Sequence, residues 1–273
     1  MRGMYRHAGL LLAMALPAAE ETTGPDSPLV AALCNEWGVL GKYVGDFDKA
    51  EARYRRALTI YEWIFGTDHD TVATICHNLG GLAHTRGDPT AGEPWAARAV
   101  RIRTHTHGPD HILTALDTAA WAALLEGCGR PDEAARCLER SLTIFRSTYG
   151  SEHYEVAVTV HNIGALQHRR GALASAASNY LSALSLKERL LGTDHPDLAT
   201  TLANLGALHQ AHSETKQAAA CYERVVGLLS RHVRDDHPTL RLAQAALSRL
   251  TPESAQRPTT RAGPDDPDGR PHL

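Results

Sequence analysis

Histidines recur every 42 residues in this chain, and imidazole is the side chain that most often binds transition metals. The series is His69, His111, His153, His195 and His237, with Ser27 in phase one period earlier. Packed helices lie about 8–10 Å apart, whereas zinc needs its nitrogen ligands within about 2.1 Å. Equivalent histidines in successive copies therefore cannot share an ion. We expect each Asp-His phrase to lie in a loop entering a helix, with the acidic residue near the helix N-terminus.

A denser local group comprises His105, His107, His111 and Asp110. It has two interpretations, a metal site or solvated loop residues, and we favour the second. Catalysis is not favoured either, because the sequence contains no His-Glu-x-x-His, Gly-x-Ser-x-Gly or phosphate-binding glycine motif. Two pairs of histidines seven residues apart, His77 with His84 and His161 with His168, lack a nucleophile or acid partner. We predict no enzyme activity, cofactor or metal.

The 42-residue period itself predicts a stacked array in which each copy contributes two helices. The first helix of the first copy should run from about Pro28 to Val44. The turn glycines of the first three copies are Gly45, Gly87 and Gly129. One column holds the helical glycines Gly38, Gly80, Gly164 and Gly206, with Ala122 in the third copy. Because glycine inside a helix costs about 1 kcal/mol relative to alanine, its repetition indicates close approach between helices.

The second helix of the first copy carries Ala50, Tyr54, Ala57 and Leu58 on its buried face. These columns, with the Gly-x-Asp-His phrase, resemble the tetratricopeptide repeat, and the long period resembles its kinesin-light-chain type. The resemblance covers roughly residues 8–250. It implies an all-α, right-handed superhelical solenoid of antiparallel helix pairs.

Two copies depart from the pattern. Ser213 replaces the turn glycine in the fifth copy. Pro89, Gly92 and Pro94 crowd the start of the second helix in the second copy, so this helix is expected to start late or to be loose.

The two ends differ from the full copies. Residues 1–21 match the second helix of a copy, because Ala8, Leu12, Ala15 and Leu16 precede Ala50, Tyr54, Ala57 and Leu58 by 42 residues. We favour this half repeat over a signal peptide, which the apolar start also resembles. Residues 22–250 should hold five full repeats and a terminal capping helix. Residues 251–273 are rich in proline and should be disordered.

Composition excludes several classes of function. The net charge of −3 and the pI of about 6.6 argue against a broad nucleic-acid interface. No apolar stretch approaches the ~20 residues of a membrane span. The five cysteines include no Cys-x-x-Cys pair, which favours a reduced, cytoplasmic protein.

An arginine column repeats through the second helices, at Arg56, Arg98, Arg140 and Arg224, with Ser182 in the fourth copy. It could bind an acidic ligand. We favour a structural role, in which each arginine pairs with an acidic residue of a neighbouring loop.

The resemblance places the first helices on the concave face, where a peptide would bind. One helical stripe then presents a polar set: Asn35, Lys42, Tyr43, His77, Asn78, His84, Glu126, His161, Asn162, His168, Arg169, Asn204 and Gln210. Ala119, Ala120 and Ala123 should form an apolar stretch between the polar groups. In kinesin-light-chain-like proteins, asparagines in the column of Asn78, Asn162 and Asn204 hold a peptide main chain, as a carboxamide both donates and accepts.

We therefore expect a non-catalytic scaffold that binds a protein or peptide partner in its concave groove. The alternative is a sensor or regulatory repeat fragment of a larger signalling or transcription-regulating protein. Since unperturbed histidine has a pKa near 6.5, we expect the groove histidines to favour an acidic peptide more at pH 6 than at pH 8.

Overall fold

The computed structural model describes residues 2–231, 233, 235 and 237–250, so the tail predicted at residues 251–273 lies outside the described part. The described residues form α-helices and one 3₁₀ turn, with no strand among them. The helices are α1 (Arg2–Thr23), α2 (Pro28–Val44), α3 (Phe47–Phe65), α4 (Asp70–Arg86), α5 (Pro89–His107), α6 (Ile112–Gly127), α7 (Pro131–Tyr149), α8 (Tyr154–Arg169), α9 (Leu173–Leu191), α10 (Ala199–Ala211), α11 (Thr215–Leu229) and α12 (Pro238–Leu250), and the 3₁₀ turn is η1 (Pro196–Leu198). The all-α prediction is confirmed, and α2 has the predicted bounds.

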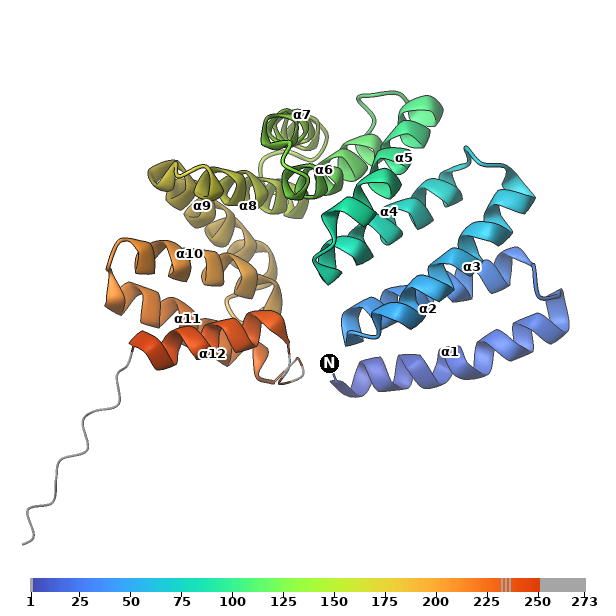
Figure 1. Ribbon diagram of the computed structural model, residues 1–273, viewed down its shortest axis with the longest axis horizontal. Coiled ribbons are helices and arrows are strands. Elements are labelled where there is room, and N and C mark those ends of the chain that lie inside the picture. Colours follow the sequence, from blue (N-terminus) through green and yellow to red (C-terminus); the bar gives the residue numbers. More distant parts are fainter. Residues whose placement is uncertain (1, 232, 234, 236, 251–273) are drawn as a thin grey trace, which may run out of the picture.

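The helices pair within each copy and stack from copy to copy as an arch (Figure 1). Pairs form between α2 and α3, α4 and α5, α6 and α7, α8 and α9, and α10 and α11. The backbones of the first helices α2, α4, α6, α8, α10 and α12 also lie close to one another in sequence, whereas those of the described second helices do not approach one another as closely. This asymmetry curves the solenoid, so the first helices line its inner side.

A histidine of the 42-residue series caps the start of four copies. The Nδ1 atoms accept hydrogen bonds from the backbone N–H two residues later, at 3.2–3.3 Å, in the pairs His69–Thr71, His111–Leu113, His153–Glu155 and His195–Asp197. Ser27, in the same phase, accepts one from the Val30 N–H at 3.3 Å. An aromatic ring four residues earlier stacks on three of these histidines. Each histidine lies in the loop before a first helix, as expected. Its imidazole accepts a hydrogen bond from a backbone N–H at the start of that helix.

The neighbouring acidic residues have another role. Asp68 pairs with Arg101 at 3.0 Å and Asp110 pairs with Arg140 at 2.8 Å. The acidic residues lie beside the helix N-terminus, where they were expected, but a ring nitrogen takes the capping position that a serine or aspartate oxygen commonly occupies.

The glycine column lets a second-helix side chain lie against the first-helix backbone. A Cβ atom on Gly38 would lie 2.5 Å from the Tyr54 ring, and one on Gly206 would lie 2.9 Å from the Tyr222 ring. Tyr54 and Tyr222 are both buried. The predicted close approach is thus confirmed, and it explains why these copies keep a residue that weakens an isolated helix.

The turn between the two helices needs a left-handed backbone. Gly45 and Gly87 have φ of 83° and 84°, and Ser213 has φ of 60°, the only positive value at a non-glycine residue in the described part. The second copy was predicted to have a late or loose second helix, and the late start is wrong. Helix α5 begins at Pro89, because proline suits the first helical position and Asp88 accepts a hydrogen bond from the Ala91 N–H at 3.0 Å.

The arginine column forms structural ion pairs, as favoured. The N–O distances are 2.5 Å for Arg56–Glu20, 2.6 Å for Arg98–Glu62, 2.8 Å for Arg140–Asp110 and 2.6 Å for Arg224–Glu188. Three of the four acids lie in the preceding second helix rather than in a loop, which corrects the expectation. Arg56, Arg98 and Arg224 reach the loop through a backbone carbonyl instead.

Within the described residues, no helix combines the length and apolar composition needed to cross a bilayer.

Candidate functional site

A hollow of about 260 Å³ opens on the inner side of the arch, where α2, α4, α6 and α8 converge. Four residues of the predicted stripe line it, namely Lys42, His77, His84 and Asn162. The remaining lining comes from Gly81, Thr85, Ala96, Ala99, Asp117, Ala119, Ala120, Ala123 and Leu124. The alanines predicted to lie between the polar groups are therefore part of the same hollow.

Lys42 brings a cation into the hollow without an acidic partner. Its Nζ lies over the backbone of Gly81. A Cβ atom on Gly81 would be 3.2 Å from this Nζ. Lys42 has no ion pair or hydrogen bond among the described residues, and burial lowers the pKa of its ammonium group. A half-buried ammonium group without a counter-ion favours an anionic ligand, which would restore the interactions lost with water.

His84 lies next to this cation. Burial is the main cause that lowers the pKa of His84, and the charges of Lys42 and Arg169 lower it further. A neutral imidazole both donates and accepts a hydrogen bond. The lowered pKa favours this neutral form, so His84 can offer a hydrogen bond beside the positively charged Lys42.

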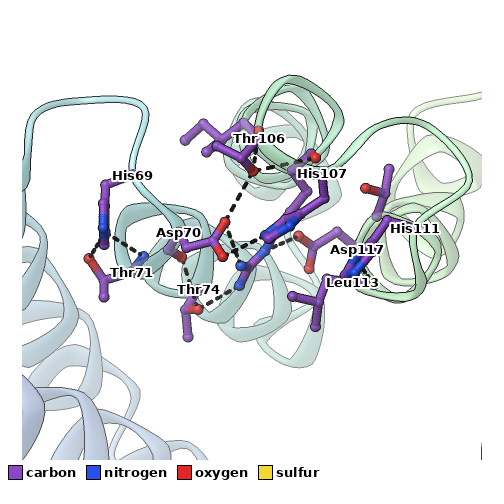
Figure 2. Close-up of polar contacts among 12 residues, drawn as sticks. His69, Asp70, Thr71, Thr74, Thr106, His107, His111, Leu113 and Asp117 are labelled. Atoms are coloured by element: carbon purple, nitrogen blue, oxygen red, sulfur yellow. Dashed lines mark hydrogen bonds and ion pairs between the residues drawn. The ribbon is translucent and has the colours of Figure 1, made fainter.

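His77 and Asp117 form another wall of the hollow and belong to a charge network centred on the buried Arg103 and Asp117 (Figure 2). His77 Nδ1 lies 2.8 Å from Asp117 Oδ1, and Arg103 Nε lies 3.5 Å from Asp117 Oδ2. Arg103 also pairs with Asp70 at 2.8 Å, and Asp70 bonds with His107 Nε2 at 2.6 Å. The Asp117 carboxylate at this wall is thus paired with Arg103 and His77, whereas Lys42 has no ion pair among the described residues.

The histidine group weighed as a metal site is engaged in this network. His107 bonds to Asp70 and stacks on His111, with the ring centroids 4.4 Å apart. His111 Nδ1 caps α6, and Asp110 pairs with Arg140. Among the described residues, no group of three or more histidine, cysteine, aspartate or glutamate side chains could hold a metal ion.

The three asparagines of the predicted peptide ladder differ in what they contact. Asn78 donates to Asn35 Oδ1 at 2.8 Å, joining α4 to α2. Asn204 lies 3.4 Å from His161 Nε2. Asn162 lines the hollow, and its carboxamide has no hydrogen bond within the described part of the chain. Asn162 therefore has its full hydrogen-bonding capacity available for a ligand.

The remaining predicted residues lie outside the hollow. Tyr43 stacks on Tyr5, Glu126 pairs with Arg169, His168 meets the edge of the Tyr180 ring, and Gln210 accepts a hydrogen bond from Tyr222. His161 is buried and bonds with Thr201 at 3.0 Å. Burial, aided by the Lys187 charge, lowers the pKa of His161 to about 3. His161 therefore cannot be one of the histidines that titrate between pH 6 and pH 8.

Three residues of this region were missed from the sequence: Gly81, Arg103 and Asp117. A signal for two of them was present. In the columns of Arg103 and Asp117, the third and fourth copies carry Phe145 and Thr159. The column of Asp117 is uncharged in the other copies, whereas the column of Arg103 also holds Lys187 in the fourth copy. A carboxylate at an otherwise uncharged packing column, 14 residues after a basic residue, indicates a buried ion pair.

Comparison with known proteins agrees with this architecture. One tetratricopeptide repeat model matches residues 30–91, 116–189 and 176–231, and another matches residues 72–113. A comparison with curated protein sequences finds no match.

Three solved structures illustrate the similarity. BtubC (BKLC) from P. vanneervenii has a TM-score of 0.60 and 21% identity, over 98% of this chain and 96% of that chain. The nearly identical TPR-like repeats of a kinesin light chain candidate from Podosopora anserina have a TM-score of 0.52 and 21% identity, over 67% and 86%. The Rap conjugation gene regulator of plasmid pLS20, solved in complex with the Phr* peptide, has a TM-score of 0.70 and 16% identity, over 84% and 60%. At these identities the similarity shows the fold.

Proposed function

Because the chain belongs to the tetratricopeptide repeat family, we propose that it is a non-catalytic scaffold that binds an extended peptide segment of a partner protein in its concave groove. The observation that carries the proposal is Lys42, a half-buried ammonium group without an acidic partner in a hollow of about 260 Å³. The hollow would accept one acidic side chain of the peptide.

The groups around Lys42 support the rest of the interaction. The Asn162 carboxamide can pair with a peptide N–H and C=O together. Ala119, Ala120 and Ala123 offer a short apolar surface beside it. A peptide that crosses from α2 toward α8 would place an acidic residue on Lys42 and its main chain on Asn162.

The expectation that an acidic peptide binds more tightly at pH 6 than at pH 8 relied on the groove histidines. Two of these histidines give it less support. The pKa of His161 is near 3, and the pKa of His84 is lowered by burial and by two neighbouring cations. His161 therefore stays uncharged at pH 6, and the lowered pKa of His84 reduces the part that this side chain can take in such a preference. The main attraction for an acidic side chain comes from Lys42.

The sensor alternative uses the same groove. The Rap regulator that the chain resembles was solved with a peptide bound, which favours a peptide-responsive array. In that case peptide binding would change the affinity for a second partner, whereas a simple scaffold would show one binding event.

A peptide-library screen tests the proposal. Peptides selected on the wild-type chain should share an acidic residue, and Lys42→Met should reduce their affinity at least tenfold. Asn162→Ala should also weaken binding, and it breaks no hydrogen bond of the described fold. Asn78 and Asn204 are less suitable, because their side chains contact Asn35 and His161.

The matched control is Lys49→Met. Lys49 is exposed on α3 and pairs with Asp46 at 2.8 Å, outside the hollow. Equal losses in the Lys42 and Lys49 variants would indicate a nonspecific charge effect and contradict the proposed site. Selection of peptides without acidic residues would contradict the assigned role of Lys42.

A further inference from the structure

Helix α1 exposes an apolar face. Leu10, Leu11 and Met14 are 58%, 67% and 74% exposed. On the opposite face, Leu16 and Ala19 are buried where α1 packs on α2. Large apolar side chains that cluster on one exposed face are typical of an interaction surface.

The same positions are different in the other second helices. In the column of Met14 the later copies carry Arg56, Arg98, Arg140, Ser182 and Arg224. In the column of Leu10 they carry Ala52, Pro94, Arg136, Ser178 and Ala220. Large flexible hydrophobic side chains at both columns occur in α1 alone, so the repeat pattern does not explain them.

The column of Leu11 has polar contacts in two of the full copies. Its equivalent in the first copy is Arg53, whose guanidinium lies 4.2 Å above the Trp37 ring of α2. In the fourth copy the same column holds Asn179, which donates a hydrogen bond to Gln167 Oε1 of the paired helix α8 at 2.8 Å. In α1 the same position holds the exposed, apolar Leu11.

Charges flank the apolar face of α1. On a helical projection with about 100° per residue, one stripe of α1 is about 80° wide. It comprises Arg6, Leu10, Met14, Pro17 and Glu21. Arg6 and Glu21 are exposed and have no ion pair among the described residues. The stripe is thus basic at one end, apolar in the centre and acidic at the other end. Such a stripe complements itself when two copies run antiparallel, because each Arg6 then meets the Glu21 of the other copy.

We propose that α1 is a homodimer interface, in which the α1 helices of two copies of this chain pack antiparallel about a twofold axis near Met14. The contact is isologous, so the same patch serves both copies. A single helix pair buries less area than a standard interface of about 1,600 Å², so we expect a concentration-dependent dimer.

The opposite end of the array does not offer a matching surface. The exposed face of α12 carries Arg241, Gln244 and Ser248, with Leu242 as an exposed large hydrophobic residue. Head-to-tail assembly between α12 and α1 is therefore less favoured than pairing of two α1 helices.

Sedimentation equilibrium of the full chain tests this inference. The wild-type chain should dimerise reversibly, and Leu10→Glu with Met14→Glu should shift the dissociation constant at least tenfold toward monomer. The matched control is Leu181→Glu, because Leu181 is 56% exposed on α9 and lies far along the chain from α1. Circular dichroism should show that each variant keeps the helical fold.

The charges give a second test that does not rely on loss of function. Arg6→Glu alone and Glu21→Arg alone should each weaken the dimer, and the double exchange should restore it, because the pairs are reversed together. A wild-type chain that stays monomeric up to about 200 µM would overturn the inference. A dimer that persists unchanged in the Leu10 and Met14 variant would overturn the assignment to α1. Neither outcome bears on peptide binding in the concave groove.

Discussion

The ring of Tyr54 lies against the backbone of Gly38, so that a Cβ atom on Gly38 would be 2.5 Å from Tyr54 Cε1. The same relationship joins Gly206 to Tyr222 four helix pairs further along the array and Gly164 to Tyr180 between them. It is the contact that fixes how closely the two helices of a copy pack.

We predict that Gly38→Ala destabilises the protein by about 2 kcal/mol, because overpacking of a rigid ring costs more than the helix propensity that alanine gains. Urea unfolding measures the effect. The matched control is Gly227→Ala in α11, where a Cβ atom would meet nothing within 4 Å. This control should be neutral or stabilising by up to about 1 kcal/mol. Equal effects of the two substitutions would show that packing against Tyr54 is not the reason for Gly38.

Ser213 holds a left-handed backbone at φ of 60° in a turn where the other copies use glycine. Ser213→Gly should raise the free energy of unfolding by about 0.5–1 kcal/mol, since relief of the left-handed strain exceeds the extra chain entropy of glycine. The reverse exchange, Gly171→Ser in the preceding copy, should lower it by a similar amount. Thermal unfolding of both variants provides the comparison, and opposite signs are required.

Arg103 and Asp117 are each less than one tenth exposed and belong to one network with Asp70. Arg103→Phe should cost about 3–5 kcal/mol, because it leaves the Asp117 carboxylate buried beside His77 alone. Addition of Asp117→Thr should recover most of this loss, since Phe145 and Thr159 occupy the same two columns one copy later. A double variant as unstable as the single variant would mean that the two charges do not depend on each other.

His161 gives a prediction for pH. Burial, with the nearby Lys187, lowers its pKa to about 3, and its ring contacts Thr201, Asn204 and Tyr180. Below pH 6.5 the unfolded chain binds a proton at His161 and the folded chain does not. This stabilisation is therefore complete above pH 6.5 and declines as the pH falls toward 3, by about 1.4 kcal/mol per pH unit.

Urea unfolding at pH 7, 6 and 5 checks this dependence. The wild-type chain should lose roughly 2 kcal/mol more than His161→Gln between pH 6.5 and pH 5. His168→Gln, on the same helix face, is the control and should keep the wild-type slope. Identical pH profiles for all three proteins would contradict the burial argument for His161.

The sequence predicts the fold well because the fold depends on repeated columns. The bounds of α2, the contacts of the glycine column and the ion pairs of the arginine column all follow from residues that recur in phase. The candidate site is less predictable, because it depends on single residues that break the phase. Gly81, Arg103 and Asp117 each occur in one copy, and no period indicates how they combine.

The asparagines and histidines of the stripe show the same limit. Periodicity places Asn78, Asn162 and Asn204 in one column, but it cannot say that Asn78 bonds to Asn35 while Asn162 has no partner among the described residues. It also cannot distinguish His84 and His161 from a histidine with an unshifted pKa. Their altered pKa values depend on burial by neighbouring copies and on cations from other helices.

A double-mutant cycle tests the central claim most directly. The affinity of a selected acidic peptide, and of the same peptide with its acidic residue changed to the amide, would be measured on the wild-type chain and on Lys42→Met by calorimetry. The account predicts a coupling free energy of about 1–3 kcal/mol between the acidic residue and Lys42. A coupling near zero, with the acidic residue still required for binding, would contradict the claim that Lys42 in the hollow is what the peptide recognises.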